Sequence, residues 1–135
     1  MIRRAVLVLL LCVVSSTSFA HSRKKLSHVV DGSYSSALAA ANRFLHAWQT
    51  EDHETGIVML SDSARQHASS EKLQRFFSPG PQAAYEIAHG RRMNEGEYSF
   101  PVVLFNGSDA PARPHFSTIL VTHEGKSGWA VSKLP

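Results

Sequence analysis

The chain almost lacks cysteine, because its 135 residues contain only Cys12. Cys12 lies in an apolar stretch near the N-terminus, and if that stretch is cleaved off, no thiol remains. This absence excludes disulfide bonds, thiolate nucleophiles and cysteine-bound zinc in the mature protein. Lipidation of Cys12 is not expected either, since three leucines precede it where a bacterial lipoprotein signal has small residues.

Long apolar runs are also scarce, and the longest one covers residues 5–14. As a helix, this run would rise about 15 Å, which is half of a bilayer core. Arg3 and Arg4 precede it, and small residues ending at Ala20 follow it. This order is typical of a cleaved secretory signal peptide over residues 1–20. We therefore expect a secreted or periplasmic protein that keeps no stable membrane anchor.

An excess of one charge is missing as well. The whole chain has 14 Lys and Arg against 11 Asp and Glu, and two of the basic residues, Arg3 and Arg4, leave with the signal peptide. A nearly neutral mature chain with scattered positive residues does not predict a nucleic-acid partner, because such binding needs clustered phosphate contacts.

The remaining chain predicts a flexible N-terminal arm over residues 21–34 and a single domain over residues 35–135. Asp31 and Gly32 give a turn signal within the arm. A helix is expected over residues 36–49 with Ser35 or Ser36 as its N-cap. Its apolar residues recur at intervals of three and four and form one stripe: Ala37, Leu38, Ala41, Phe44, Leu45 and Trp48.

Three shorter helical segments are predicted next, with Asp52 capping the first, a restart at residues 61–65, and Ser69 capping the last. Pro79, Gly80 and Pro81 end this helical half. Beyond them the apolar period changes to two, which predicts four strands over residues 84–93, 97–105, 115–123 and 129–134. Short turns favour an antiparallel sheet, so the fold class is α+β, with N-terminal helices packed on the sheet.

Both faces of the predicted strands carry apolar side chains, as at Phe100 and Val103. Because a sheet face in water is normally polar, either the sheet curls or a second subunit covers it. We expect a homodimer formed through the sheet.

The order of these elements resembles the nuclear transport factor 2-like superfamily. The likeness rests on Ala-x-x-Phe-Leu-x-Ala-Trp at residues 41–48, Ile-Val-Met-Leu-Ser at 57–61, a short helix ending in Phe76 and Phe77, and Gly-Trp-Ala-Val-Ser-Lys-Leu at 128–134. It implies a cystatin-like cone, in which a long helix crosses a curved four-stranded sheet around a pocket. The superfamily includes ketosteroid isomerase, SnoaL-type cyclases and scytalone dehydratase. No catalytic residue carries over, because no stretch matches the reacting groups of these enzymes.

The stretch His46-Ala-Trp-Gln-Thr-Glu-Asp-His-Glu-Thr-Gly56 is rich in histidine and carboxylates, but a metal site is not expected there. A helical zinc motif needs a second histidine four residues after His53, where Ile57 stands. His46 lies opposite the apolar stripe and should face solvent. Asp52 is expected to act as a helix cap.

Alternating strand residues are the better candidates for a small-molecule site. Tyr85 and His89 share one face of the first strand with Ile87, Arg91 and Met93, and His115 shares one face of the third strand with Ser117, Ile119, Val121 and His123. If these faces line the cone, their polar groups would meet a ligand. The alternative is a position at strand ends or on the outer face. Trp48 and Trp129 are further candidates, although each also fits a core position.

The predicted function is therefore a non-enzymatic domain without cofactor or metal. It would bind a small apolar or amphipathic ligand or a protein partner, with Trp48, Tyr85, His89, His115 and Trp129 as ligand-binding residues. The alternative is an isomerase or dehydratase that uses a pocket acid or histidine, His89 or His115, as general base. Metal binding by histidines is a third hypothesis.

Export can be tested on the protein secreted by its own host. We expect N-terminal sequencing of the secreted chain to read His-Ser-Arg-Lys-Lys, starting at His21, because cleavage follows Ala20. A chain that stays in the cell with Met1 or Ile2 at its N-terminus would contradict export.

Overall fold

The structure is a computed structural model that describes residues 31–107, 111–126 and 128–135. The predicted signal peptide and residues 21–30 of the predicted arm lie outside these ranges. Within them the helices are α1 (Gly32–Gln49), α2 (His53–Val58), α3 (Asp62–His67) and α4 (Ser70–Phe76). The strands are β1 (Ala84–Ile87), β2 (Arg91–Asn94), β3 (Glu97–Phe105), β4 (Pro114–Glu124) and β5 (Gly128–Lys133).

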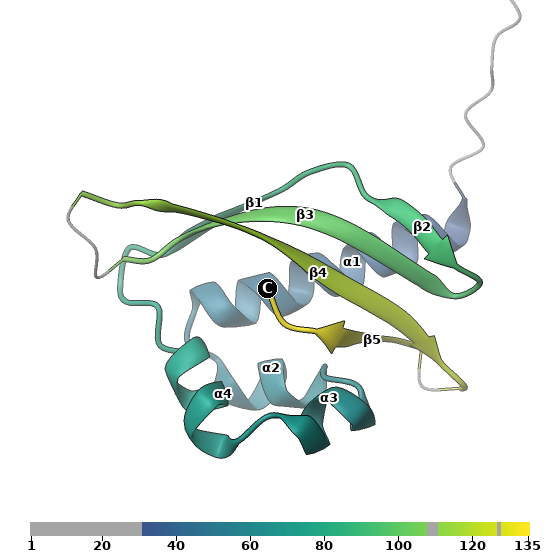
Figure 1. Ribbon diagram of the computed structural model, residues 1–135, viewed down its shortest axis with the longest axis horizontal. Helices are drawn as coiled ribbons and strands as arrows, with labels where there is room; N and C mark the ends of the chain where they lie inside the picture. Colours follow the sequence, from purple (N-terminus) through teal and green to yellow (C-terminus); the bar gives the residue numbers. More distant parts are fainter. Residues whose placement is uncertain (1–30, 108–110, 127) are drawn as a thin grey trace, which may run out of the picture.

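The strands form one open sheet in the order β1-β3-β4-β5, and β2 pairs with β3 beyond the end of β1. Every strand pair is antiparallel. In Figure 1 the long strands β3 and β4 arch over α1, and α2, α3 and α4 group together on the side away from the arch. The predictions of an α+β class and of helices packed on a curved antiparallel sheet are confirmed.

The predicted number of four strands is wrong, because residues 84–93 form two strands instead of one. The Ala88 amide still donates to the Pro101 carbonyl at 2.9 Å, so Pro101 presents its backbone toward this edge of β3. In an antiparallel strand the N–H and C=O of one residue point to the same side, and proline has no N–H to donate. The ladder therefore breaks opposite Pro101. Gly90 passes so close to the Phe100 ring that any side chain there would collide with it.

Helix α1 begins at Gly32, four residues before the predicted start at Ser36. Asp31 is its N-cap, and the Asp31 carboxylate accepts a hydrogen bond from the Ser33 amide at 3.0 Å. Asp31 and Gly32 are compatible with a turn. An aspartate just before a helix can, however, also accept hydrogen bonds from the free amides of the first helical turn. The predicted cap at Ser35 or Ser36 is wrong.

The other predicted caps are confirmed. The Asp52 carboxylate accepts from the Thr55 amide at 3.0 Å, and the Ser69 hydroxyl accepts from the Lys72 amide at 3.2 Å. Ser61 starts α3 at the predicted restart, with its hydroxyl accepting from the Ala64 amide at 3.0 Å. The starts of these short helices are thus set by polar capping residues.

The core lies between α1 and the concave face of the sheet. In the predicted stripe of α1, Leu38 is half-buried and the other residues are buried, with Phe44 fully and Trp48 all but 1 % removed from solvent. Opposite it lie the inward residues of the sheet: Tyr98, Phe100, Val102, Leu104, Ile119, Val121 and Val131. Strand β5 also joins the short helices to the sheet, because the Ser61 amide donates to the Val131 carbonyl at 2.9 Å. None of the described helices is long and apolar enough to cross a membrane.

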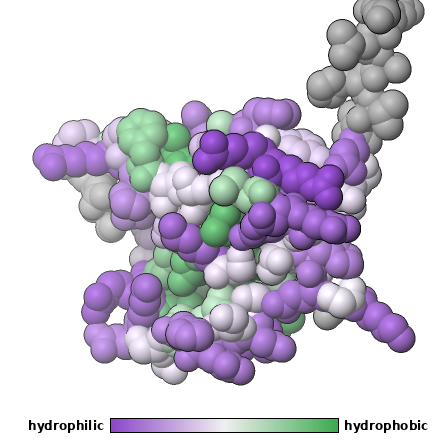
Figure 2. Space-filling model, turned by 45° about the vertical axis from the view of Figure 1, so that its right-hand side comes forward, coloured by the Kyte–Doolittle hydropathy of each residue, from purple (hydrophilic) through white to green (hydrophobic). Residues whose placement is uncertain are grey.

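The convex face of the sheet keeps apolar surface in solvent. Phe116 on β4 is 75 % exposed and pairs in register with the half-buried Val103 of β3, and Pro101 is exposed nearby. Figure 2 shows hydrophobic surface in only a few places on one side of the molecule, with hydrophilic side chains around them. An exposed phenylalanine beside other apolar groups favours an interface.

We propose that the expected homodimer uses this convex face. Burial of the Phe116 ring would contribute about 1.5–3 kcal/mol. Phe116→Glu should therefore raise the dimer dissociation constant at least about tenfold, which sedimentation velocity over a range of concentrations would measure. Val58→Glu is a matched control, because Val58 is 68 % exposed on α2 and should leave the constant unchanged. A wild-type chain that remains monomeric at every concentration would contradict the proposal.

Candidate functional site

A pocket of about 370 Å³ lies where the ends of α1 and α4 meet the ends of β3 and β4. We call it the α4 pocket. It is lined by Trp48, Arg75, Phe76, Ser78, Pro79, Leu104, Asn106, His115 and Pro135. These residues come from five separate segments of the chain, so only the folded protein brings them together.

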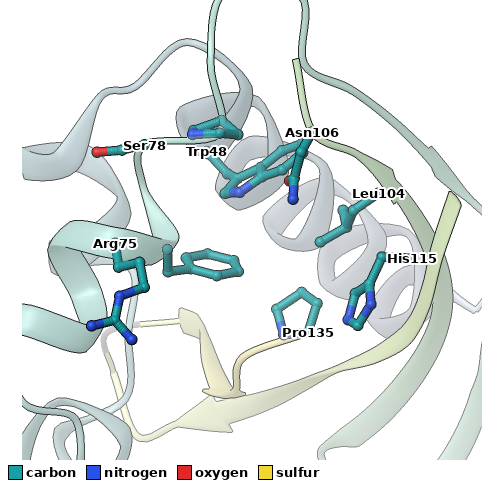
Figure 3. A pocket seen from close by; sticks show the side chains of 9 residues that line it. Trp48, Arg75, Ser78, Leu104, Asn106, His115 and Pro135 are labelled. Atoms are coloured by element: carbon teal, nitrogen blue, oxygen red, sulfur yellow. The ribbon is translucent and has the colours of Figure 1, made fainter. Parts of the chain in front are cut away.

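The walls of the α4 pocket combine apolar and polar side chains. The Trp48 and Phe76 rings contact each other with centroids 6.3 Å apart, and Leu104 is 4 % exposed on the sheet side. In Figure 3, Trp48, Leu104 and Pro135 border the same open space. An apolar ligand surface would find contacts on several sides there.

Among the residues that line this pocket, His115 and Arg75 can carry a charge. Arg75 donates to the Glu71 carboxylate at 2.8 Å, and Figure 3 shows its guanidinium directed away from the open space. His115 instead lies beside Pro135 at the edge of that space. His115 and the amide of Asn106 therefore provide the polar groups of the sheet side.

The position of His115 follows from strand alternation. His115 pairs with Leu104, Ser117 pairs with Val102 and Ile119 pairs with Phe100, so the predicted shared face of β4 is the concave face. For the first predicted strand the shared face is wrong at Arg91. After the break at Pro101, Arg92 pairs with Tyr98 and Arg91 pairs with Ser99, which turns Arg92 rather than Arg91 to the concave side.

The structure brings together two of the five predicted ligand-binding residues, Trp48 and His115. Tyr85 is half-buried, its hydroxyl donates to the Asn42 carbonyl at 3.3 Å, and burial raises its pKa. His89 is exposed between β1 and β2, where its Nδ1 lies 3.2 Å from the Tyr34 hydroxyl. Trp129 lies at the other end of the sheet, against Tyr98 and His123.

Several pocket residues had no signal in the sequence. Phe76 was assigned only to the end of a helix, and Asn106 only to a turn. Pro135 lines the pocket because β5 runs antiparallel to β4 and carries the residues that follow it back along β4. This placement is a tertiary effect. The alternation of residues along β4 was the one sequence pattern that identified a sheet residue of this pocket, namely His115.

The histidine-rich stretch does not form a site in this structure. His46 is exposed, as predicted, and the His53 ring packs near the Phe77 ring with centroids 5.9 Å apart. Within the described residues, no group of three or more histidines, cysteines or carboxylates could hold a metal ion.

The opposite end of the cone is held by a hydrogen bond between α1 and the sheet. The Tyr98 hydroxyl, on a side chain that is 3 % exposed, donates to the Asp31 carboxylate at 2.6 Å. This bond and the Ser33 amide lower the pKa of Asp31, and the same bond raises the pKa of Tyr98. Asp31 thus caps α1 and ties it to β3 at once.

Comparison with solved structures shows the same fold. The chain is similar to a ketosteroid isomerase-like protein from Erwinia carotovora atroseptica, with a TM-score of 0.54 and 15 % identity over 76 % of this chain and 92 % of that one. It is also similar to a domain of unknown function with a cystatin-like fold from Nostoc punctiforme, with a TM-score of 0.56 and 18 % identity over 76 % and 75 %. A cystatin-fold protein from Novosphingobium aromaticivorans gives 0.51 and 16 % over 73 % and 97 %.

No family model and no curated protein matches the sequence. At such low identities the structural likeness establishes the fold and not the activity. The chain therefore has the cystatin-like cone fold that the sequence resemblance implied.

The bond between Asp31 and Tyr98 makes stability depend on pH. Because the folded state lowers the pKa of Asp31, its contribution is present above the unfolded pKa of about 3.9 and is lost as pH falls through the folded value. We expect Asp31→Asn and Tyr98→Phe each to flatten the fall in the free energy of unfolding between about pH 4 and pH 2. Urea unfolding at each pH measures this slope, and an unchanged slope in both variants would contradict the assignment.

Proposed function

We propose that this chain is exported and binds a small apolar or amphipathic molecule in the α4 pocket, without acting as an enzyme. The carrying observation is a concave space in which aromatic and aliphatic side chains stand beside polar side chains from the sheet and from the α4 side. Small-molecule sites combine apolar contact surface with a few placed polar groups that fix the orientation of the ligand.

The size and lining of the α4 pocket suit a small ligand. A volume of about 370 Å³ is at the lower end of the range for ligand sites, roughly 300–1,000 Å³. The apolar part of the ligand would pack on the half-buried Phe76 ring, with the buried Trp48 and Leu104 behind it. A hydroxyl or carboxylate at its other end would accept hydrogen bonds from Asn106 and His115.

Two features favour binding over catalysis. The interior beyond the pocket is filled by core side chains such as Phe44, Phe77 and Phe100. The described residues that line the pocket include a histidine but no Asp or Glu side chain, whereas general acid–base chemistry needs two groups in defined positions. In the alternative isomerase or dehydratase, the base would be His115, since His89 contacts Tyr34 outside this pocket.

The proposal can be tested with 1-naphthoate as a probe, because it joins an aromatic body to one carboxylate. The indole N–H resonances of the two tryptophans can be followed by NMR. We expect the Trp48 resonance to shift and saturate with a dissociation constant of about 1 mM or lower. His115→Trp should weaken binding at least about tenfold, because the larger ring fills the pocket while replacing an exposed side chain.

Phe116→Trp is the matched control, since it adds an indole one residue away on the convex face and should leave the affinity unchanged. Equal loss in both variants would indicate general damage to β4. A Trp48 resonance that does not move at about 10 mM naphthoate, well above the expected constant, would exclude a pocket of this type.

A further inference from the structure

A second pocket, of about 390 Å³, lies at the opposite end of the molecule, beside the first turn of α1. It is formed where the β2–β3 and β4–β5 hairpin ends meet, and we call it the Trp129 pocket. It is lined by Ser33, Arg92, Glu95, Gly96, Tyr98, His123 and Trp129. The packed core between α1 and the sheet separates it from the α4 pocket.

Two aromatic rings form a corner in this pocket. The Trp129 ring meets the Tyr98 ring edge to face, with centroids 5.6 Å apart and planes inclined by 61°. The His123 ring meets Trp129 at 5.1 Å and 74°. Tyr98 is 3 % exposed and Trp129 is half-buried, so Trp129 provides the accessible aromatic surface.

This corner is held in place by the backbone and by hydrogen bonds. The hydroxyl of Tyr98 is occupied by Asp31 at 2.6 Å. Gly96 adopts a positive φ of 73° in the tight turn after β2, and its carbonyl accepts from the His123 amide at 2.7 Å. The ring corner and the turn that carries Glu95 are therefore fixed relative to each other before a ligand arrives.

The charges around the corner are balanced. Arg92 and Glu95 are the two oppositely charged residues among those that line the pocket. The Nε of Arg92 donates to the Asn94 carbonyl at 3.3 Å, and Arg92 also helps to lower the pKa of Asp31, which indicates that its charge lies near that carboxylate. A ligand with a net charge of either sign would meet one attracting and one repelling group, so the pocket offers no net attraction to charge.

We propose that the Trp129 pocket binds a neutral polyhydroxylated ring, such as one pyranose unit of a carbohydrate. The C–H face of such a ring packs on the Trp129 indole, whose face carries partial negative charge. Each sugar hydroxyl both donates and accepts, so neighbouring hydroxyls can accept from Arg92 and donate to Glu95. Ser33 and His123 supply further hydrogen-bonding groups on the same wall.

The test uses the mature full-length chain and methyl β-D-glucopyranoside, followed through the two indole N–H resonances. Trp129→Phe assigns the resonances. We expect the glucoside to shift the Trp129 resonance to saturation with a dissociation constant of about 1–10 mM and to leave the Trp48 resonance unmoved. Naphthoate binding in the α4 pocket is followed through Trp48, whereas glucoside binding in the Trp129 pocket is followed through Trp129. Failure of either proposal is therefore seen separately.

Three comparison compounds decide the chemical class. Choline carries a positive charge, benzoate carries a negative charge, and glycerol has hydroxyls but no ring face. The proposal is supported if the glucoside binds at least about tenfold more tightly than each of them. It is overturned if choline, benzoate or glycerol moves the Trp129 resonance as effectively, or if the glucoside does not move it at about 100 mM.

Variants of the charged residues test the hydrogen bonds. Arg92→Gln and Glu95→Gln should each weaken glucoside binding about tenfold, because a bond to a charged group is replaced by a weaker one. Arg91→Gln is the matched control, since Arg91 is the neighbour of Arg92 on β2 and pairs with Ser99 on the other face. Equal affinities in the Arg91 and Arg92 variants would overturn the assigned contacts.

Discussion

The packing of α1 against the concave side of β3 and β4 is the constraint on which the rest of the structure depends. Phe44 and Trp48 fill this space together with Phe100 and Ile119, and each fully buried side chain of this size contributes about 1.5–3 kcal/mol. Because these rings fill the space between the C-terminal half of α1 and the sheet, the interior is packed there. The α4 pocket and the Trp129 pocket lie beyond the two ends of this contact.

The two ends are built from different kinds of segment. At the end with Trp48, the C-terminal turns of α1 and α4 bring aromatic rings toward the sheet. At the end with Trp129, the β2–β3 hairpin contributes two charged residues, Arg92 on β2 and Glu95 in the turn. Both ends therefore place polar groups beside aromatic rings, but helices supply the rings at one end and strands supply them at the other.

The sequence was sufficient for features that depend on near neighbours. The α1 stripe, the caps at Asp52 and Ser69 and the alternation that directs His115 inward are local patterns with fixed spacing. The break opposite Pro101 could not be read in the same way, because it requires the pairing of β3 with a strand about ten residues earlier. For that reason Arg92 was missed, and Arg91 was assigned to the concave face in its place.

Pro101 also limits how these molecules can associate. An uninterrupted edge strand offers a row of unpaired amides and carbonyls to any other extended chain, and proteins commonly protect such edges. Here the edge beside β3 consists of two four-residue strands, β1 and β2, separated by residues 88–90, which belong to no strand. A neighbouring chain would lose its register at that gap, so the proline that shortens the ladder also disfavours growth into an extended β-aggregate.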